Sequence, residues 1–172
     1  MSKVILNGVI VDDAWTLVPV EPADFALPHH GKIIVPLTRW LSARDALLVR
    51  ADAVGVWLDS HEDPAELERD LVVLPLIAVN FPAFKDGRGY STAFLLRQRY
   101  GFKGELRAIG DVLRDQLFYL KRVGFNAFAV RADRDMDDAL KALGDFSEVY
   151  QGSIDQPLPL FRRRDTAVKV AA

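Results

Sequence analysis

The sequence predicts an α/β protein built on a parallel sheet of about five strands, with helices alternating between them. Two observations predict this fold class. Short apolar runs recur along the chain, and helix-capping residues and glycine stops lie between them. The runs begin near Ile33, Val54, Val72, Glu105 and Ala127. This alternation favours right-handed strand–helix–strand units, and five units are too few to close an eight-stranded barrel, so we expect an open sheet or a partial barrel.

Residues 1–31 are expected to form a β-hairpin and then a segment that wraps the edge of the domain. Asn7-Gly8 lies between apolar residues, which is a strong signal for a two-residue hairpin turn. From Asp12 to Gly31 the chain shows no regular pattern and is predicted to be irregular. Trp15 is expected to anchor this segment by its burial.

The helices are predicted from their start signals. Each expected helix begins after a side chain that can accept a hydrogen bond from a free backbone N–H group. These expected N-cap residues are Ser42, Asp63, Ser91, Asp111 and Asp135. Between the second and third helices, Leu71–Phe81 is almost entirely apolar, which predicts a long strand buried on both faces. Pro75 would be its first residue or lie at a bulge.

Length and composition limit the class of protein. The 172 residues are expected to form one domain, 1–172, with a proline-rich, irregular tail at residues 152–172. The formal net charge of -2 gives no drive toward nucleic acid or a membrane. Because the apolar runs are too short to span a bilayer and the first residues lack a signal-peptide pattern, we expect a cytoplasmic protein.

Several kinds of chemistry are excluded by the residues present. The chain has no cysteine, so it can hold no disulfide, no catalytic thiolate and no conventional iron–sulfur cluster. None of the three histidines has a partner at metal-ligand spacing, so no metal site is expected. A Walker motif and a full dinucleotide fingerprint are both lacking, which argues against a flavin or nicotinamide and leaves any cofactor unknown.

The most promising binding site is the loop Lys85–Ser91, which follows the third predicted strand. Parallel α/β proteins form their sites at the carboxyl ends of strands. Glycines permit positive φ and close approach of the backbone, a helix start offers free N–H donors, and a guanidinium can bind an oxyanion. The candidate anion-binding residues are Lys85, Gly87, Arg88, Gly89 and Ser91. The alternative is a tight turn, a helix cap and an arginine paired with an acid.

The fourth predicted strand supplies the candidate catalytic residues. Glu105 and Arg107 share one of its faces, and Asp111 follows its end. A general base would have to be Asp111, Asp86 or Glu105. If the strand is central, its charges must be paired, with neighbouring residues or with a ligand, and if it is an edge strand they are simply solvated. The alternative for Asp111 is a role as a helix cap.

A long block of the sequence resembles a bacterial family of uncharacterised proteins, the domain of unknown function family 934. The block runs from Phe81 to Phe128, and the Asp13-x-Trp15 and Tyr150-Gln151 elements are similar as well. Its most specific parts are Phe81-Pro82, Asp86-Gly87-Arg88, Tyr90-Ser91, Leu96-Arg97, Gly104-Glu105-Leu106-Arg107-Ala108, Gly110-Asp111-Val112, Asp115-Gln116 and Gly124-Phe125. The resemblance implies an oxidoreductase or accessory factor of assimilatory sulfite or sulfate reduction, because such proteins accompany sulfite reductase in the genome. It supplies no catalytic residues.

Two readings of the function follow. An enzyme or anion-binding factor predicts a concave site at the strand exits, lined by Arg88, Arg107 and Asp111. A non-catalytic protein that docks on sulfite reductase predicts that those charges pair internally and that an exposed apolar patch lies elsewhere. The N-terminal hairpin and the segment that holds Phe25 and Leu27 are the expected positions of such a patch. The reductase itself is excluded, because its sirohaem and cluster need thiolate ligands.

Overall fold

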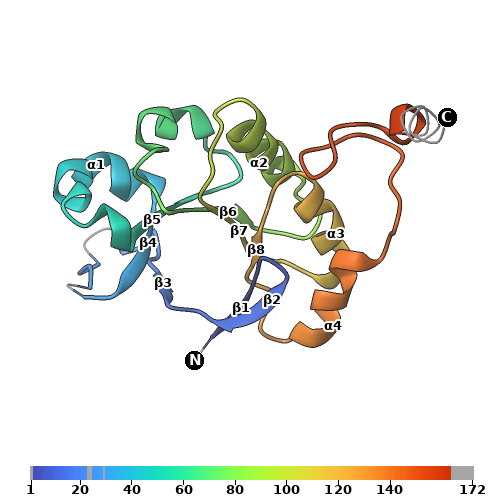
Figure 1. Cartoon of the computed structure of the whole chain (residues 1–172). Helices are drawn as coiled ribbons and strands as arrows, with labels where there is room; N and C mark the ends of the chain where they lie inside the picture. Colours follow the sequence, from blue (N-terminus) through green and yellow to red (C-terminus); the bar gives the residue numbers. More distant parts are fainter. Residues whose placement is uncertain (1, 23–24, 29, 164–172) are drawn as a thin grey trace.

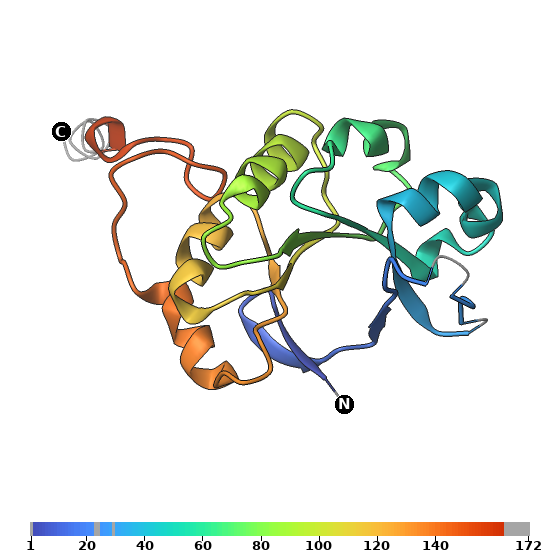
Figure 2. The ribbon, with the colours of Figure 1, turned by 180° about the vertical axis from the view of Figure 1, so that it is seen from behind.

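The protein forms a single eight-stranded sheet that curls into a half-barrel (Figures 1 and 2). The computed structural model describes residues 2–22, 25–28 and 30–163. The strand order across the sheet is β2-β1-β8-β7-β6-β5-β4-β3. The strands are β1 (Lys3–Leu6), β2 (Val9–Asp12), β3 (Trp15–Leu17), β4 (Lys32–Pro36), β5 (Val54–Leu58), β6 (Leu76–Phe81), β7 (Glu105–Gly110) and β8 (Ala127–Phe128).

The parallel core of the sheet is confirmed. Strands β4 to β8 correspond to the five predicted strands, and each pairs with the next in parallel. The third of them is shorter than predicted, because it begins at Leu76 and not near Val72. Residues 71–74 instead turn out of a 3-10 helix, with the N–H groups of Val73 and Leu74 donating to the carbonyl of Asp70. Pro75 then precedes the strand, where its missing N–H group disturbs no ladder bond.

The N-terminal segment adds three strands. The hairpin of β1 and β2 is confirmed, since Asn7 and Gly8 take φ values of 51° and 79° as a type I′ turn requires. Residues 15–17, which were predicted to be irregular, form β3 and pair in parallel with β4, while β1 pairs antiparallel with β8. The prediction of about five strands plus a hairpin was therefore too low. Since β2 and β3 lie at opposite edges of the sheet but are joined by Asp13-Ala14, the short link draws the two edges toward each other.

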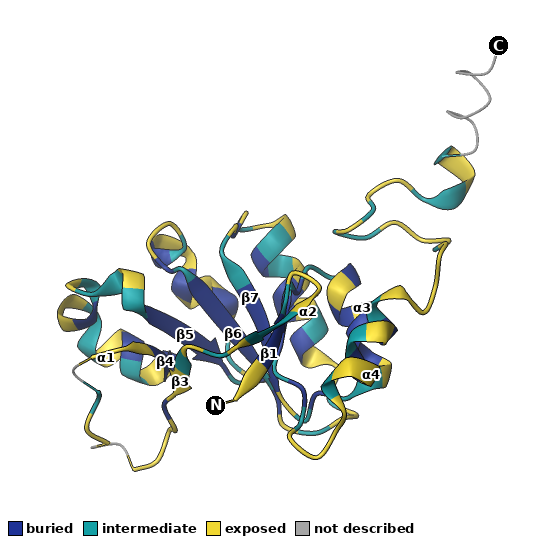
Figure 3. Ribbon diagram, turned by 60° about the horizontal axis from the view of Figure 1, so that its bottom comes forward, coloured by how far each residue is buried: buried dark blue, intermediate teal, exposed yellow. Residues whose placement is uncertain are grey.

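The helices lie on the convex side of the half-barrel. The strands that they cover are buried (Figure 3). They are α1 (Leu37–Leu48), η1 (Ala51–Ala53), η2 (Pro64–Asp70), α2 (Arg88–Gln98), α3 (Arg114–Arg122), α4 (Met136–Lys141) and η3 (Ala142–Gly144). The main hydrophobic core lies between these helices and the sheet. Within the described residues, no helix combines the length and the apolar character that crossing a bilayer requires.

Two of the predicted helix caps are confirmed and three are wrong. Asp63 accepts a hydrogen bond from the N–H of Ala65, and Asp135 accepts one from Asp138. Ser42 and Ser91 lie inside α1 and α2, because these helices begin earlier, at Leu37 and Arg88. Asp111 lies before α3, whose first turn is closed by Gln116: its side-chain oxygen accepts the N–H of Leu113 at 2.8 Å. In α3 another acceptor thus takes the place of the predicted one, while α1 begins after Pro36 without a side-chain cap.

The concave side holds a second, smaller core. Inward-facing side chains of the four strands β4 to β7 form it, with Trp15 packed against them: Ile34, Trp57, Leu76, Ala78 and Ile109. The indole N–H of Trp57 donates to the carbonyl of Val18 at 2.9 Å, which fastens the N-terminal segment over this core. The interior of the half-barrel is therefore filled with side chains.

One buried cation lies on the same concave face. The side chain of Arg107 is only 3% exposed. Its Nη1 donates to both carboxylate oxygens of Asp13, at 3.0 and 2.9 Å, and its Nε donates to Glu105 at 2.7 Å. Because Asp13 lies in the link between the two edge strands, this cluster joins that link to the middle of the sheet.

Residues 145–163 form a C-terminal arm that extends away from the half-barrel (Figure 3). Arg122 anchors it, since Ser153 donates its hydroxyl, and Ile154 its N–H, to the carbonyl of Arg122. Residues 152–159 are irregular as predicted, and residues 160–163 form a helical turn. The rest of the predicted tail, residues 164–172, lies outside the described residues.

The Arg107 cluster generates a prediction about stability. Replacement of Arg107 by methionine keeps most of the side-chain volume but leaves Asp13 and Glu105 facing each other without a cation. We expect the free energy of unfolding, measured by urea titration, to fall by about 3 kcal/mol. Arg134→Met, which removes an exposed arginine, should change it by less than about 0.5 kcal/mol. Equal effects of the two changes would contradict a structural role for the cluster.

Candidate functional site

The carboxyl ends of β5 to β8 meet along one edge of the half-barrel, which we call the strand-exit rim. It consists of residues 59–62, 80–91, 110–111 and 131–134. The side-chain amide of Asn80 donates to the carboxylate of Asp59 at 3.1 Å, which joins the exits of β5 and β6. The rim is thus a set of polar groups held together across neighbouring strands, at the position where parallel sheets place their sites.

Arg88 lies at the start of α2 and is fixed by two acceptors. It binds both oxygens of Asp86, from Nε at 3.0 Å and from Nη2 at 2.6 Å, and Nη2 also donates to Ser60 at 2.8 Å. These hydrogen bonds from Arg88 hold the pKa of Asp86 well below its usual range. The arginine is paired with an acid, as the alternative interpretation expected, yet its side chain stays 61% exposed.

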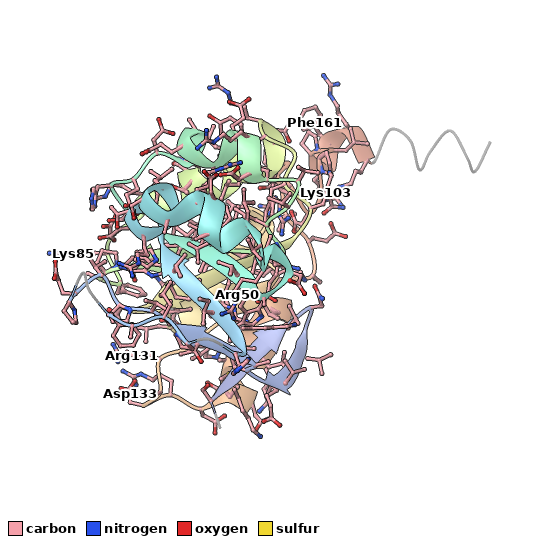
Figure 4. The ribbon with its side chains drawn as sticks, turned by 90° about the vertical axis from the view of Figure 1, so that its left-hand side faces the viewer. Arg50, Lys85, Lys103, Arg131, Asp133 and Phe161 are labelled. Carbon is pink, nitrogen blue, oxygen red and sulfur yellow. The ribbon has the colours of Figure 1, made fainter. Side chains whose placement is uncertain are left out.

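The rest of the Lys85–Ser91 loop differs from what its glycines suggested. Neither Gly87 nor Gly89 takes a positive φ. A Cβ atom on Gly89 would lie 2.6 Å from the ring of Phe81, so this glycine makes room for an aromatic side chain. Ser91 is exposed inside α2, while Lys85 extends outward from the rim (Figure 4). The exposed cations of the loop are therefore Lys85 and Arg88.

The three candidate catalytic residues are divided between the two ends of β7. Glu105 and Arg107 lie in the first half of the strand and bind each other, while Asp111 follows its last residue. Asp111 lies six positions after Glu105, which corresponds to roughly 20 Å along an extended strand. The structure therefore does not bring Asp111 together with the other two residues.

Asp111 acts as a bridge between two strand exits. One of its oxygens accepts the backbone N–H of Phe84 at 2.9 Å, and the other accepts a hydrogen bond from Arg131 at 2.6 Å. Arg131 also binds Asp133, and hydrogen bonds to Asp133 and Asp111 raise the pKa of the Arg131 guanidinium above its ordinary value. The carboxylate of Asp111 is thus occupied on both sides.

Sequence reasoning missed two polar residues of the rim, Asn80 and Glu62. Asn80 interrupts the otherwise apolar run of β6, and that interruption was a usable signal. Glu62 offered no such signal in the sequence. It follows the exit of β5, and its carboxylate accepts a hydrogen bond from the backbone N–H of Asp59 at 2.6 Å. Burial raises the pKa of Glu62. A carboxyl group that holds its proton more tightly is the rim's best candidate for a proton donor.

The chemistry that this arrangement allows is limited. The described residues contain no cluster of three histidine, aspartate or glutamate side chains placed to hold a metal ion. The charges on the rim alternate in sign, and most of them pair with one another. What the rim offers a ligand is the exposed guanidinium of Arg88, the ammonium group of Lys85 and the protonatable Glu62.

Among the exposed large apolar side chains of the described residues, two groups concern the expected docking patch. On the C-terminal arm, the rings of Tyr150 and Phe161 lie 6.4 Å apart, and Leu158 is between them in sequence. These three side chains are 63%, 51% and 50% exposed. In the N-terminal segment, where a patch was expected, Leu17, Val20 and Phe25 are exposed, whereas Leu27 packs partly against the core.

Comparison with known proteins found a match to one protein family. The family model described as bacterial protein of unknown function (DUF934) matches residues 55–161, which include β5 to β8, the strand-exit rim and most of the arm. No curated protein and no solved structure matches the chain.

Glu62 generates a prediction about pH. Its pKa in the folded protein lies above the ordinary value of 4.5, so the folded state binds this proton more tightly than the unfolded state. The stabilisation that this tighter proton binding gives the folded state is complete below pH 4.5, and it is lost as the pH rises through the raised pKa of Glu62. The variant Glu62→Gln carries no charge. We therefore expect the variant to be more stable relative to the original protein near pH 7 than near about pH 4. The free energy of unfolding of the variant minus that of the original protein should thus be larger near pH 7.

Urea titrations at several pH values measure this difference. Glu68→Gln, which changes an exposed carboxylate of η2, serves as the control and should show a smaller trend. A difference for Glu62→Gln that does not vary with pH would contradict the burial argument.

Proposed function

This chain belongs to the bacterial DUF934 family, and we propose that it serves assimilatory sulfite reduction as a non-catalytic accessory protein that docks on sulfite reductase. The family resemblance supplies the process. One observation carries the choice of an accessory role: the charged residues expected to perform catalysis are paired within the fold.

The pairing argues against catalysis in physical terms. Glu105 and Arg107 are consumed by a buried cluster with Asp13, and Asp111 holds Phe84 and Arg131. A general base needs a free lone pair within hydrogen-bond reach of its substrate. A role in catalysis would have to compete with these internal contacts, although each carboxylate keeps further acceptor sites. The internal pairing matches what a docking protein was expected to have.

The docking surface that we propose is the aromatic patch of the C-terminal arm, formed by Tyr150, Leu158 and Phe161. Tyrosine and phenylalanine provide much contact area at a small loss of side-chain freedom, and such residues are enriched at interfaces. The arm extends away from the half-barrel (Figure 3), so a partner can reach the patch without displacing any strand. The N-terminal patch of Leu17, Val20 and Phe25 is less exposed.

Docking through the arm is testable with purified sulfite reductase of the same cell. The original chain should bind it, and Tyr150→Ser and Phe161→Ser should each weaken binding by about tenfold or more, since truncated interface anchors cost about 2 kcal/mol. Val49→Ser, at an exposed valine outside the arm, is the matched control and should leave the dissociation constant unchanged. Absence of any complex would refute docking on the reductase, and equal affinities of all variants would exclude the arm.

A second candidate function is the binding of a small oxyanion at Arg88. One observation favours it: the guanidinium is held in place by Asp86 and Ser60, and its Nη1 makes no hydrogen bond to any described residue. A pre-oriented, exposed donor at the start of a helix suits sulfate, sulfite or phosphate. The nearby Asp86 opposes an anion, which is why we place this role second.

A thermal-shift series at constant ionic strength tests the second candidate. A bound oxyanion should stabilise the protein by about 2.7 kcal/mol at a hundredfold excess over its dissociation constant. Arg88→Ala should lose this shift, whereas Arg99→Ala, at an exposed arginine just beyond the same helix, should keep it. Equal shifts in all three proteins would mean that Arg88 is not the contact, and no shift in any would remove the candidate.

A further inference from the structure

A groove of about 660 Å³ lies at the opposite end of the half-barrel from the strand-exit rim. It is bounded by the turn of the β1–β2 hairpin, the beginning of β8 and the carboxyl ends of α3 and α4 (Figures 1 and 2). Small-molecule sites in proteins commonly measure roughly 300–1,000 Å³. The groove is therefore large enough for a metabolite.

The body of the groove is apolar. Phe125 and Phe128 form part of its lining and are themselves almost fully buried, at 2% and 1% exposure. Leu140 of α4 and Leu143 of η3 add two half-buried aliphatic side chains. Because aromatic and aliphatic groups dominate the lining, a ligand with an apolar body would gain from leaving water.

Two lysines are among the residues that line this groove. Lys121 and Lys141 belong to the last turns of α3 and α4, and both line the groove. Lys121 donates to the carbonyl of Leu143 at 3.3 Å. Neither lysine forms an ion pair with a carboxylate in the part of the chain that the structure describes, although Asp137 lies one turn before Lys141.

The other polar side chains of the groove are already satisfied. Asn126 donates to the side-chain oxygen of Asn7 at 3.1 Å, while its own oxygen accepts from Leu106 and Arg97. The asparagines are thus occupied in fixing the hairpin to β8. The lysines are the polar groups that remain able to select a ligand.

We propose that this groove binds an amphiphilic anion, a molecule with an apolar body and one carboxylate group. The apolar body packs mainly against Leu140 and Leu143, in the groove that Phe125 and Phe128 help to line, and the carboxylate accepts hydrogen bonds from Lys121 and Lys141. Helix dipoles alone favour cations in the last turns of α3 and α4. They do not account for the convergence of both lysines on one apolar groove.

Octanoate is the probe for this site, with binding measured by isothermal titration calorimetry on the whole chain. We expect Lys121→Met and Lys141→Met each to weaken octanoate binding by about tenfold, because each loses a charge-assisted hydrogen bond but keeps an unbranched stem. Lys3→Met, at an exposed lysine at the far end of β1, is the matched control and should bind normally. All three changes are on exposed side chains, so thermal unfolding should be close to that of the original protein.

Two related compounds separate the parts of the proposal. Octanamide has a similar apolar body without charge and should bind at least about tenfold more weakly than octanoate. Acetate has the charge without the body and should not bind measurably. In NMR spectra, octanoate should shift the amide signals of Gly8, Asn126 and Gly144, which line the groove.

Each outcome of these experiments either supports the proposal or overturns it. No binding of octanoate at millimolar concentration, equal affinity of octanoate and octanamide, or full affinity in the double variant of Lys121 and Lys141 would each overturn the proposal. Shifts confined to other parts of the chain would do the same. Because the test needs neither sulfite reductase nor sulfate, sulfite or phosphate, it does not depend on the functions proposed above.

Discussion

The buried ion cluster of Asp13, Arg107 and Glu105 is the interaction on which the half-barrel depends. A guanidinium removed from water is tolerated only when carboxylates compensate its charge. One of these carboxylates comes from the same strand, and the other comes from the link between the two edge strands. Asp13 also accepts the backbone N–H of Trp15 at 3.1 Å, so one side chain orients the link and fastens it to the centre of the sheet. Without this cluster, the same strands could form a more open sheet.

The buried ion cluster also limits the places on the fold that a ligand can reach. Because Arg107 and Glu105 maintain the curvature and the concave core is filled, the interior of the half-barrel offers no room for a substrate beside them. The accessible features lie on the outside: the strand-exit rim, the aromatic patch of the arm and the groove next to α4.

Features governed by neighbouring residues could be predicted from the sequence. The Asn7-Gly8 turn, the Asp63 and Asp135 caps and the parallel strands all follow from local chemistry. The curl of the sheet could not be predicted, because it involves contacts between distant residues, such as the pairing of Asp13 with Arg107 94 positions away, and an edge strand, β3, of only three residues. The caps of α2 and α3 failed because Asp86 and Gln116 are competing acceptors close by. At the candidate site, Arg88 lay on the rim as expected, but the bridge from Asp111 to Arg131 joins two separate strand exits.

The position of β1 in the sheet has a consequence for biosynthesis. Residues 3–6 leave the ribosome early, yet their partner β8 is made only at residues 127–128. Until then the hairpin has a free edge, and Val4 and Ile5, which are 1% and 0% exposed in the finished fold, remain in water. Pairings between such distant segments are slow to form and leave apolar edges open to other chains. The outer edge of β1 must therefore stay unpaired, or be shielded by a chaperone, until β8 has been synthesised.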